Sequence, residues 1–174
     1  KDYDHIGYLP EERGLYPKMR VEDQVLYFAQ LHGMKASDAR RALTDWMKRF
    51  EVKGKITDKV KSLSKGNQQK VQLIATLIHE PKLVILDEPF SGLDPVNSSI
   101  LADGIKMMRD RGAAIIFSSH DMGNVEALSD NLIMLRNGHV VLDGPVSTIR
   151  ESFGRTKLFI ESGLSSEDLA AMPG

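Results

Sequence analysis

The stretch LVILDE, residues 83–88, decides the fold, because four apolar residues in a row end in two adjacent carboxylates. A short apolar run of this kind is typical of a strand buried on both faces of a parallel sheet, and we place the strand at 82–86. A second apolar run occupies 113–117, and residues 95–111 between the two runs have the spacing of a helix. Strand, helix and strand in this order predict an α/β fold with a parallel sheet.

The two carboxylates that end the first strand are candidates for chemistry, because ligand sites in open α/β sheets lie at the carboxyl ends of the strands. Successive side chains of a strand point to opposite faces, so Asp87 and Glu88 can have different roles. One can hold Mg²⁺ through water while the other orients an attacking water. An acidic residue at a strand end is also a common cap for the turn that follows, and these two residues alone leave both interpretations open.

A small polar turn, LSKGN at 63–67, opens an amphipathic helical pattern at 71–78. The free amides and the dipole of a helix N-terminus favour phosphate, and the Ser64 hydroxyl adds a hydrogen-bond donor there. Gly66 lets the backbone approach a ligand closely. An ordinary capped helix accounts for the same residues, because serine is a frequent N-cap.

His120 lies just beyond the second predicted strand, where it can reach the same sheet edge as Glu88 and contact a γ-phosphate. The tripeptide Ser-His-Asp at 119–121 is not a catalytic triad, because triads assemble from residues that converge across the fold. His79 lacks the second histidine of a zinc-binding helix and is followed by Pro81, so we interpret it as structural. The remaining histidines are expected to be isolated and solvated: His5, His32 and His139.

The rest of the chain predicts a helical subdomain and a hairpin. Residues 21–50 contain two amphipathic helical stripes, with Ser37 as the N-cap of the second helix. Two apolar runs, 132–135 and 140–142, flank Asn137-Gly138, which accept the positive φ of a tight turn and so predict an antiparallel pair. After Pro145 the pattern is too weak to place an element.

The composition is that of a globular domain or domain fragment, with 174 residues and 41% hydrophobic content. A formal net charge of -1 offers no basic surface for general nucleic-acid binding. The absence of cysteine excludes disulfides and fits a reducing compartment such as the cytoplasm. No apolar run approaches the roughly 20 residues that span a bilayer. The chain begins without Met, and we expect it to be part of a longer protein.

Four motifs together resemble an ABC transporter ATPase. LSKGN (63–67), LVILDE (83–88), SGLD (91–94) and His120 stand in the order and approximate spacing of that family's signature, Walker B motif, D-loop and switch histidine. The resemblance extends from Ile6 to about Pro145, and residues 6–11 resemble the segment that carries the family's Q-loop. The tract at 10–17 and the tail after Pro145 are similar to those of drug- or sodium-type exporter ATPases.

The resemblance implies a partial P-loop NTPase core of the ABC type, with a parallel sheet, an inserted α-helical subdomain at about 20–80 and a small C-terminal extension. It divides the chain into an ATP-binding domain at 1–145 and an extension at 146–174. The Walker A motif, G-x-x-x-x-G-K-[ST], is missing from the sequence. We therefore expect this fragment alone to bind nucleotide very weakly and to hydrolyse no ATP.

The resemblance also implies the roles of single residues. Asp87 and Glu11 would hold Mg²⁺, Glu88 would polarise the attacking water, and His120 would contact the γ-phosphate of ATP. Asp94 would couple two subunits. The nucleotide held by the opposite protomer would be bound by Ser64, Lys65, Gly66 and Asn67. The sequence departs from the family at three positions, with Glu11 for the usual Gln, Lys65 for Gly and Asn67 for Gln.

By resemblance, the parent protein is the ATP-binding subunit of an ABC transporter, which couples ATP hydrolysis to transport, with export favoured. It would form a homo- or heterodimer, with residues 21–49 and 11–16 docked on a membrane-spanning subunit, and would lie in the cytoplasm at the membrane surface. Two alternatives remain open: a soluble ABC ATPase of translation or DNA repair, and a docking or regulatory module without ATPase activity. The transported substrate is not encoded in these residues.

Overall fold

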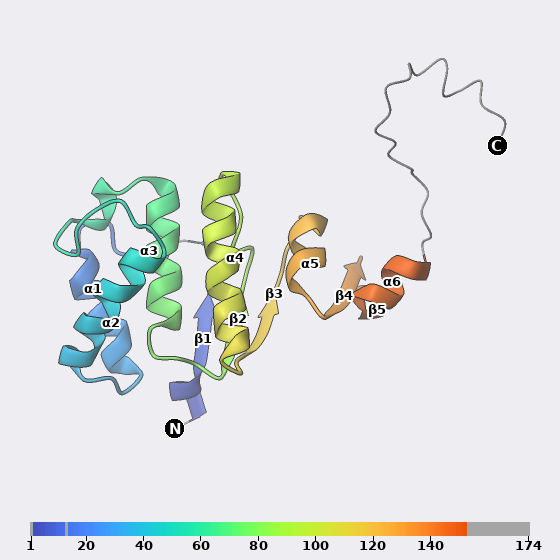
Figure 1. Ribbon diagram of the computed structural model, residues 1–174, viewed down its shortest axis with the longest axis horizontal. Helices are drawn as coiled ribbons and strands as arrows, with labels where there is room; N and C mark the ends of the chain where they lie inside the picture. The colour runs from blue at the N-terminus through green and yellow to red at the C-terminus, as the bar shows by residue number, and fades with distance from the viewer. Residues whose placement is uncertain (1, 13, 153–174) are drawn as a thin grey trace, which may run out of the picture. The chain divides into compact units, whose positions relative to one another are not determined.

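The computed structural model describes residues 2–12 and 14–152, and the chain forms two compact units, Lys1–Leu128 and Ser129–Gly174. Figure 1 shows a sheet with packed helices in the first unit and a hairpin with a short helix in the second. The predicted boundary after Pro145 falls inside the second unit, between its last strand and its helix. Of the predicted C-terminal extension, everything after residue 152 lies outside the described residues.

A parallel sheet forms the centre of the first unit. Its strands are β1 (Ile6–Leu9), β2 (Leu83–Leu86) and β3 (Ala114–Phe117), in the order β1-β2-β3. Helix α4 (Pro95–Asp110) links β2 to β3, so the predicted strand, helix and strand are confirmed to within one residue at every end. β1 was not anticipated as a strand, because a run of four residues that contains a glycine gives a weak strand pattern.

Helix α3 (Lys65–Leu77) packs beside β1. Its N-cap is Ser64, whose side chain accepts a hydrogen bond from the backbone N–H of Asn67. The helix and the strand approach closely at Gly7. A Cβ on Gly7 would lie 2.7 Å from the carbonyl oxygen of Thr76, which no side chain can do. Glycine at this position therefore lets β1 lie against α3.

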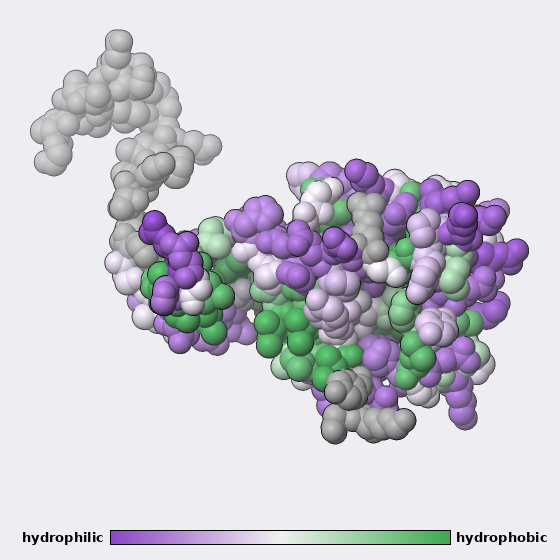
Figure 2. All heavy atoms as spheres, turned by 180° about the vertical axis from the view of Figure 1, so that it is seen from behind, coloured by the Kyte–Doolittle hydropathy of each residue, from purple (hydrophilic) through white to green (hydrophobic). Residues whose placement is uncertain are grey.

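One face of the sheet is buried and the other is not. Leu9, Val84 and Leu86 are at most 1% exposed and lie in the core with residues of α3 and α4. On the opposite face Tyr8 and Ile116 are each 59% exposed, and Figure 2 shows hydrophobic surface gathered over the first unit from behind. The expected burial of the strands on both faces is thus wrong for the described residues, since the described helices that contact the sheet pack against the face that carries Leu9, Val84 and Leu86.

The remaining described elements of the first unit are helical. They are η1 (Asp2–His5), α1 (Val21–Leu31), α2 (Ala36–Arg49), η2 (Val60–Ser62) and α5 (Met122–Leu128). The predicted pair of helices at 21–50 is confirmed by α1 and α2. In the described part of the chain no helix is long and apolar enough to cross a bilayer.

The prediction that Ser37 caps the second helix is wrong. The N-cap is Lys35, two residues earlier, which is still extended and whose carbonyl oxygen accepts hydrogen bonds from the N–H groups of Asp38 and Ala39. Lys35 makes no side-chain capping bond, and Ser37 lies inside the first turn. Helix ends inferred from a sequence are uncertain by one or two residues, and the N-cap lies two residues before Ser37.

The second unit confirms the predicted hairpin. β4 (Asn131–Arg136) and β5 (His139–Pro145) pair antiparallel across Asn137 and Gly138, which have φ of 52° and 78°. Positive φ at both positions gives the turn whose twist matches a two-stranded ribbon. Helix α6 (Val146–Ser152) follows β5 directly.

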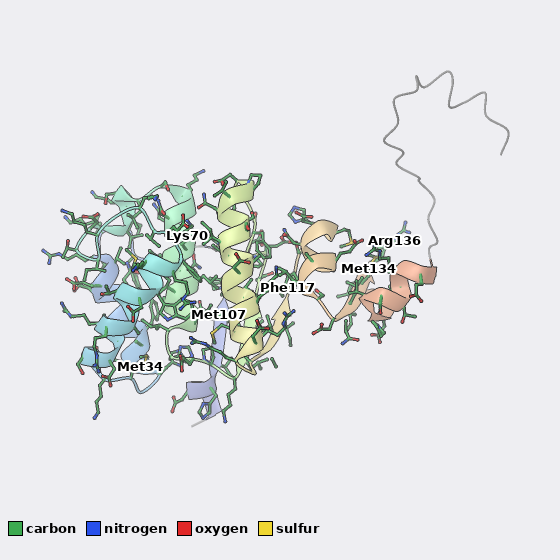
Figure 3. The ribbon with its side chains drawn as sticks, in the orientation of Figure 1. Met34, Lys70, Met107, Phe117, Met134 and Arg136 are labelled. Atoms are coloured by element: carbon green, nitrogen blue, oxygen red, sulfur yellow. The ribbon has the colours of Figure 1, made fainter. Side chains whose placement is uncertain are left out.

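The end of α2 makes a tight contact with α4. Phe50, which ends α2, is 1% exposed, and its ring lies against Gly104 in the middle of α4. Phe117 of β3, labelled in Figure 3, packs at the edge of the same core and meets the ring of Phe90 edge-on, with ring centroids 6.2 Å apart.

Gly104→Ala is expected to destabilise the chain, because the added methyl group would overlap Cε1 and Cζ of the Phe50 ring. Overpacking a buried contact costs about 1–3 kcal/mol, which exceeds the gain of about 1 kcal/mol from removing a glycine from a helix interior. Urea unfolding should show a lower midpoint with an unchanged slope. The matched control Ser99→Ala, at an exposed position of α4, should not lower the midpoint. Equal stability of Gly104→Ala and wild type would contradict the contact.

Candidate functional site

The carboxyl ends of β2 and β3 lie side by side and deliver the candidate residues to one edge of the sheet. Leu86 pairs with Phe117, and the N–H of Ser118 donates to the carbonyl oxygen of Leu86 at 2.9 Å. The segments 87–88 and 118–120 therefore leave the sheet as neighbours. This is the edge at which open α/β sheets bind ligands.

Glu88 and His120 are in direct contact at this edge. Nδ1 of His120 lies 3.0 Å from Oε1 of Glu88, and the two side chains are 81% and 20% exposed. The hydrogen bond to Glu88 and its negative charge raise the pKa of His120, with smaller contributions from Asp121 and Glu11. The contact thus favours the cationic form of the His120 imidazole, while the Glu88 carboxylate remains partly accessible to solvent.

Ser118 completes this cluster and was missed by the sequence analysis. Its hydroxyl lies 2.6 Å from Oδ1 of Asp87, to which it donates, and it accepts a hydrogen bond of 2.9 Å from the backbone N–H of Glu88. Glu88 itself has φ of 44°, a conformation that non-glycine residues rarely adopt. The sequence did contain a sign of this role, because Ser118 is a polar residue directly after the second predicted strand.

Asp87 and Glu11 are the predicted Mg²⁺ ligands, and both carry the hard oxygen donors that Mg²⁺ prefers. Asp87 is anchored to β1, since its N–H donates to the carbonyl oxygen of Leu9 at 2.8 Å. Glu11 is exposed, and its charge acts on His120 at the same edge. Within 2–12 and 14–152 no group of three or more His, Cys, Asp or Glu is arranged to hold a metal ion. These donors fit an ion that takes one or two carboxylates and completes its shell with water and phosphate.

A second cluster forms at the N-termini of α3 and α4. Asp94 caps α4 and accepts hydrogen bonds from the backbone N–H and the side-chain amide of Asn97, which lower its pKa. A Cβ on Gly66, in the first turn of α3, would lie 3.0 Å from Nδ2 of Asn97. The structure therefore brings Gly66 beside Asn97, whose side chain is hydrogen-bonded to Asp94 of the predicted D-loop.

The other signature residues differ in their accessibility. Ser64 and Lys65 are exposed, whereas Asn67 is only 9% exposed. The side-chain amide of Asn67 is already used on both sides, because its Nδ2 donates to Oγ of Ser64 at 3.0 Å and its Oδ1 accepts from the N–H of Lys53 at 3.0 Å. Asn67 thus holds the turn together, and its contact with a nucleotide stays a prediction.

Two histidines of the helical subdomain lie together, and one of them is not as expected. The rings of His32 and His79 stack with centroids 3.8 Å apart and planes 6° from parallel, so the prediction that His32 is isolated is wrong. Burial and the neighbouring His32 lower the pKa of His79 to about 4. Both rings line a cavity of about 410 Å³ between α1, α3 and β1, with Tyr8, Tyr27 and Phe28 among its walls.

Comparison with known proteins shows which family the chain resembles. Residues 2–91 match the family model described as ABC transporter. The chain is 48% identical over 169 residues to an uncharacterized ABC transporter ATP-binding protein of Alkalihalophilus pseudofirmus, which covers 97% of this chain and 63% of that protein. It is 50% identical over 157 residues to the uncharacterized ABC transporter ATP-binding protein YhaQ of Bacillus subtilis, with coverage of 90% and 53%. A solved structure of the ATP-binding subunit of an ABC transporter matches with a TM-score of 0.77 at 29% identity, covering 96% of this chain and 67% of that one.

The chain therefore belongs to the ABC transporter family, as an ATP-binding domain with that family's α/β fold. The predicted family and the predicted α/β fold with a parallel sheet are both confirmed. The chain spans 63% and 53% of the lengths of these two curated relatives.

Glu88→Gln is expected to lower the pKa of His120 toward the ordinary histidine value, because the substitution removes the charge that raises it. Since the folded-state pKa is raised, the pair stabilises the fold fully below the unfolded-state pKa and loses this effect as the pH rises through the folded-state pKa. An NMR titration of the His120 ring measures the change. Glu126→Gln, at an exposed position of α5, is the matched control and should leave the titration unchanged. A His120 pKa that is the same in Glu88→Gln and wild type would contradict the contact.

Proposed function

We propose that this chain is part of an ATP-binding subunit that couples ATP hydrolysis to transport through a separate membrane-spanning subunit. The observation that carries the proposal is the contact of Glu88 with His120 beside Asp87, at the ligand-binding edge of the sheet. A carboxylate that can orient water, an imidazole held toward its cationic form and a second carboxylate that can hold Mg²⁺ supply part of what phosphoryl transfer to water needs.

Each residue has a role in this proposal. The Glu88 carboxylate orients and polarises the attacking water, and His120 binds the γ-phosphate through the ring nitrogen that faces away from Glu88. Asp87 and Glu11 hold Mg²⁺, which neutralises phosphate charge when it is bound. The cationic form of His120, favoured by Glu88, offsets the charge that develops on the phosphate oxygens.

The second cluster serves a dimer. Ser64, Lys65 and Gly66 present a hydroxyl, a cation and free amides at the N-terminus of α3, a combination that binds phosphate. In the proposed head-to-tail dimer, homomeric or heteromeric, these groups and Asn67 contact the nucleotide held by the other protomer. Asp94, at the neighbouring helix start, couples the two subunits.

The membrane-spanning subunit is proposed to dock on the helical segment 21–49 and the tract 11–16. The cavity beside α1 supports this location, because apolar walls that include Tyr27 and Phe28 offer a receptor for apolar side chains of a partner. The protein would then lie on the cytoplasmic face of the membrane. Export is favoured by the similarity of 10–17 to the corresponding tract of drug- or sodium-type exporter ATPases.

ATP hydrolysis by the full-length gene product, compared with this 174-residue chain, tests the proposal. The full-length protein should hydrolyse ATP, and Glu88→Gln should lower kcat by about 100-fold or more, because the residue that orients the water loses its charge. The chain alone should show neither turnover nor micromolar ATP affinity by calorimetry, since its sequence has no Walker A motif.

Glu126→Gln in the full-length protein is the control and should keep wild-type turnover. Undiminished hydrolysis in Glu88→Gln would remove Glu88 from its role. A full-length protein that hydrolyses no ATP, alone or with its membrane subunit, would contradict the proposed function.

A further inference from the structure

One hydroxyl connects both carboxylate positions of the sheet edge. Oγ of Ser118 uses its single proton on Oδ1 of Asp87, at 2.6 Å, and accepts the N–H of Glu88, at 2.9 Å. Ser118 directly follows β3 and the two acidic residues directly follow β2, so the bonds join segments that are 30 and 31 residues apart in sequence. Few side chains can do this, because the position requires a short group that donates and accepts at once.

The backbone of Glu88 needs such a restraint. Its φ of 44° lies in the left-handed region, where a non-glycine residue stays only if its surroundings hold it. The N–H of the preceding residue, Asp87, donates to the carbonyl oxygen of Leu9 in β1, the strand on the other side of β2 from β3. Ser118 is the partner of the next amide, and the direction in which the Glu88 side chain leaves the backbone depends on it.

The consequence of this backbone position is the contact with His120. Glu88 Oε1 reaches the imidazole at 3.0 Å from a backbone that turns sharply after β2. A rotation of this backbone toward an ordinary φ would carry the Glu88 carboxylate away from His120. His120 cannot follow far, because it lies only three residues after the end of β3 at Phe117. Ser118 is itself exposed, so its hydroxyl contributes little to the buried core.

We infer that Ser118 is a positioning residue, whose hydroxyl fixes the Glu88 backbone and orients the Asp87 carboxylate for the reaction. The inference rests on the proposed ATP hydrolysis and adds to it a residue that touches neither the water nor the phosphate. It identifies the hydroxyl, and not the size of the side chain, as the property that matters. Threonine should therefore replace serine, whereas alanine should not.

Amide hydrogen exchange at Glu88 tests the contact without any nucleotide. In Ser118→Ala the Glu88 N–H loses its acceptor, and its exchange should accelerate by about fivefold or more, as expected for the loss of one hydrogen bond. Ser118→Thr should exchange at the wild-type rate. Ser119→Ala is the matched control, since it removes the neighbouring hydroxyl, which contacts Asp121 and not Glu88. Unchanged exchange at Glu88 in Ser118→Ala overturns the inference.

Steady-state ATP hydrolysis by the full-length gene product tests the consequence. Ser118→Ala should lower kcat by about 10-fold with KM within about twofold of wild type, and Ser118→Thr should restore kcat to within about threefold. A wild-type kcat in Ser118→Ala, or a Ser118→Thr variant as slow as Ser118→Ala, overturns the positioning role. A wild type without turnover removes the proposed function and the positioning role together, whereas the exchange rates show separately whether Ser118 holds Glu88.

Discussion

The parallel pairing of β2 with a strand on each side is the constraint on which the rest of the structure depends. Its register sets Leu86 between Leu9 and Phe117, so the three chain segments that follow these residues leave the sheet at one edge. Glu11, the Asp87-Glu88 pair and His120 are all delivered in this way. The pairing is secured by the buried face of the sheet, where side chains such as Leu9 and Leu86 each stabilise the fold by about 1.5–3 kcal/mol.

This burial allows a strained residue at the edge. The positive φ of Glu88 costs about 1–3 kcal/mol, which is comparable to the burial of a single core side chain. With the φ of an ordinary helix or strand, Glu88 would point its carboxylate away from His120. The hydrogen bonds of β2 to its neighbouring strands and the Ser118 hydroxyl hold the unusual conformation, and the fold thereby keeps Glu88 in contact with His120 at a solvent-accessible position.

The sequence predicted those parts of the fold that have a local cause. A pattern of a few neighbouring residues was enough to predict each of these elements: the apolar runs of β2 and β3, the apolar spacing of α4, and the Asn137-Gly138 turn. The candidate carboxylates and His120 were found in the same way, because they follow predicted strands, and the family resemblance then ordered them.

The features that were missed depend on contacts between distant residues. The two bonds of Ser118 join segments 30 and 31 residues apart, and the stacking of His32 on His79 joins residues of different helix ends. Neither contact leaves a periodic signal in the chain. The burial of Asn67 has the same origin, because its partner Lys53 lies in a loop whose course the sequence does not reveal.

The most direct test of the account is a double-mutant cycle on ATP turnover by the full-length gene product, with Glu88→Gln, His120→Ala and the double substitution. If the two side chains act as one unit, as their contact at 3.0 Å indicates, His120→Ala should slow the wild type but slow Glu88→Gln little further. Losses in kcat that multiply in the double variant would show that the residues act independently, and would contradict a paired reaction centre at the edge of the sheet.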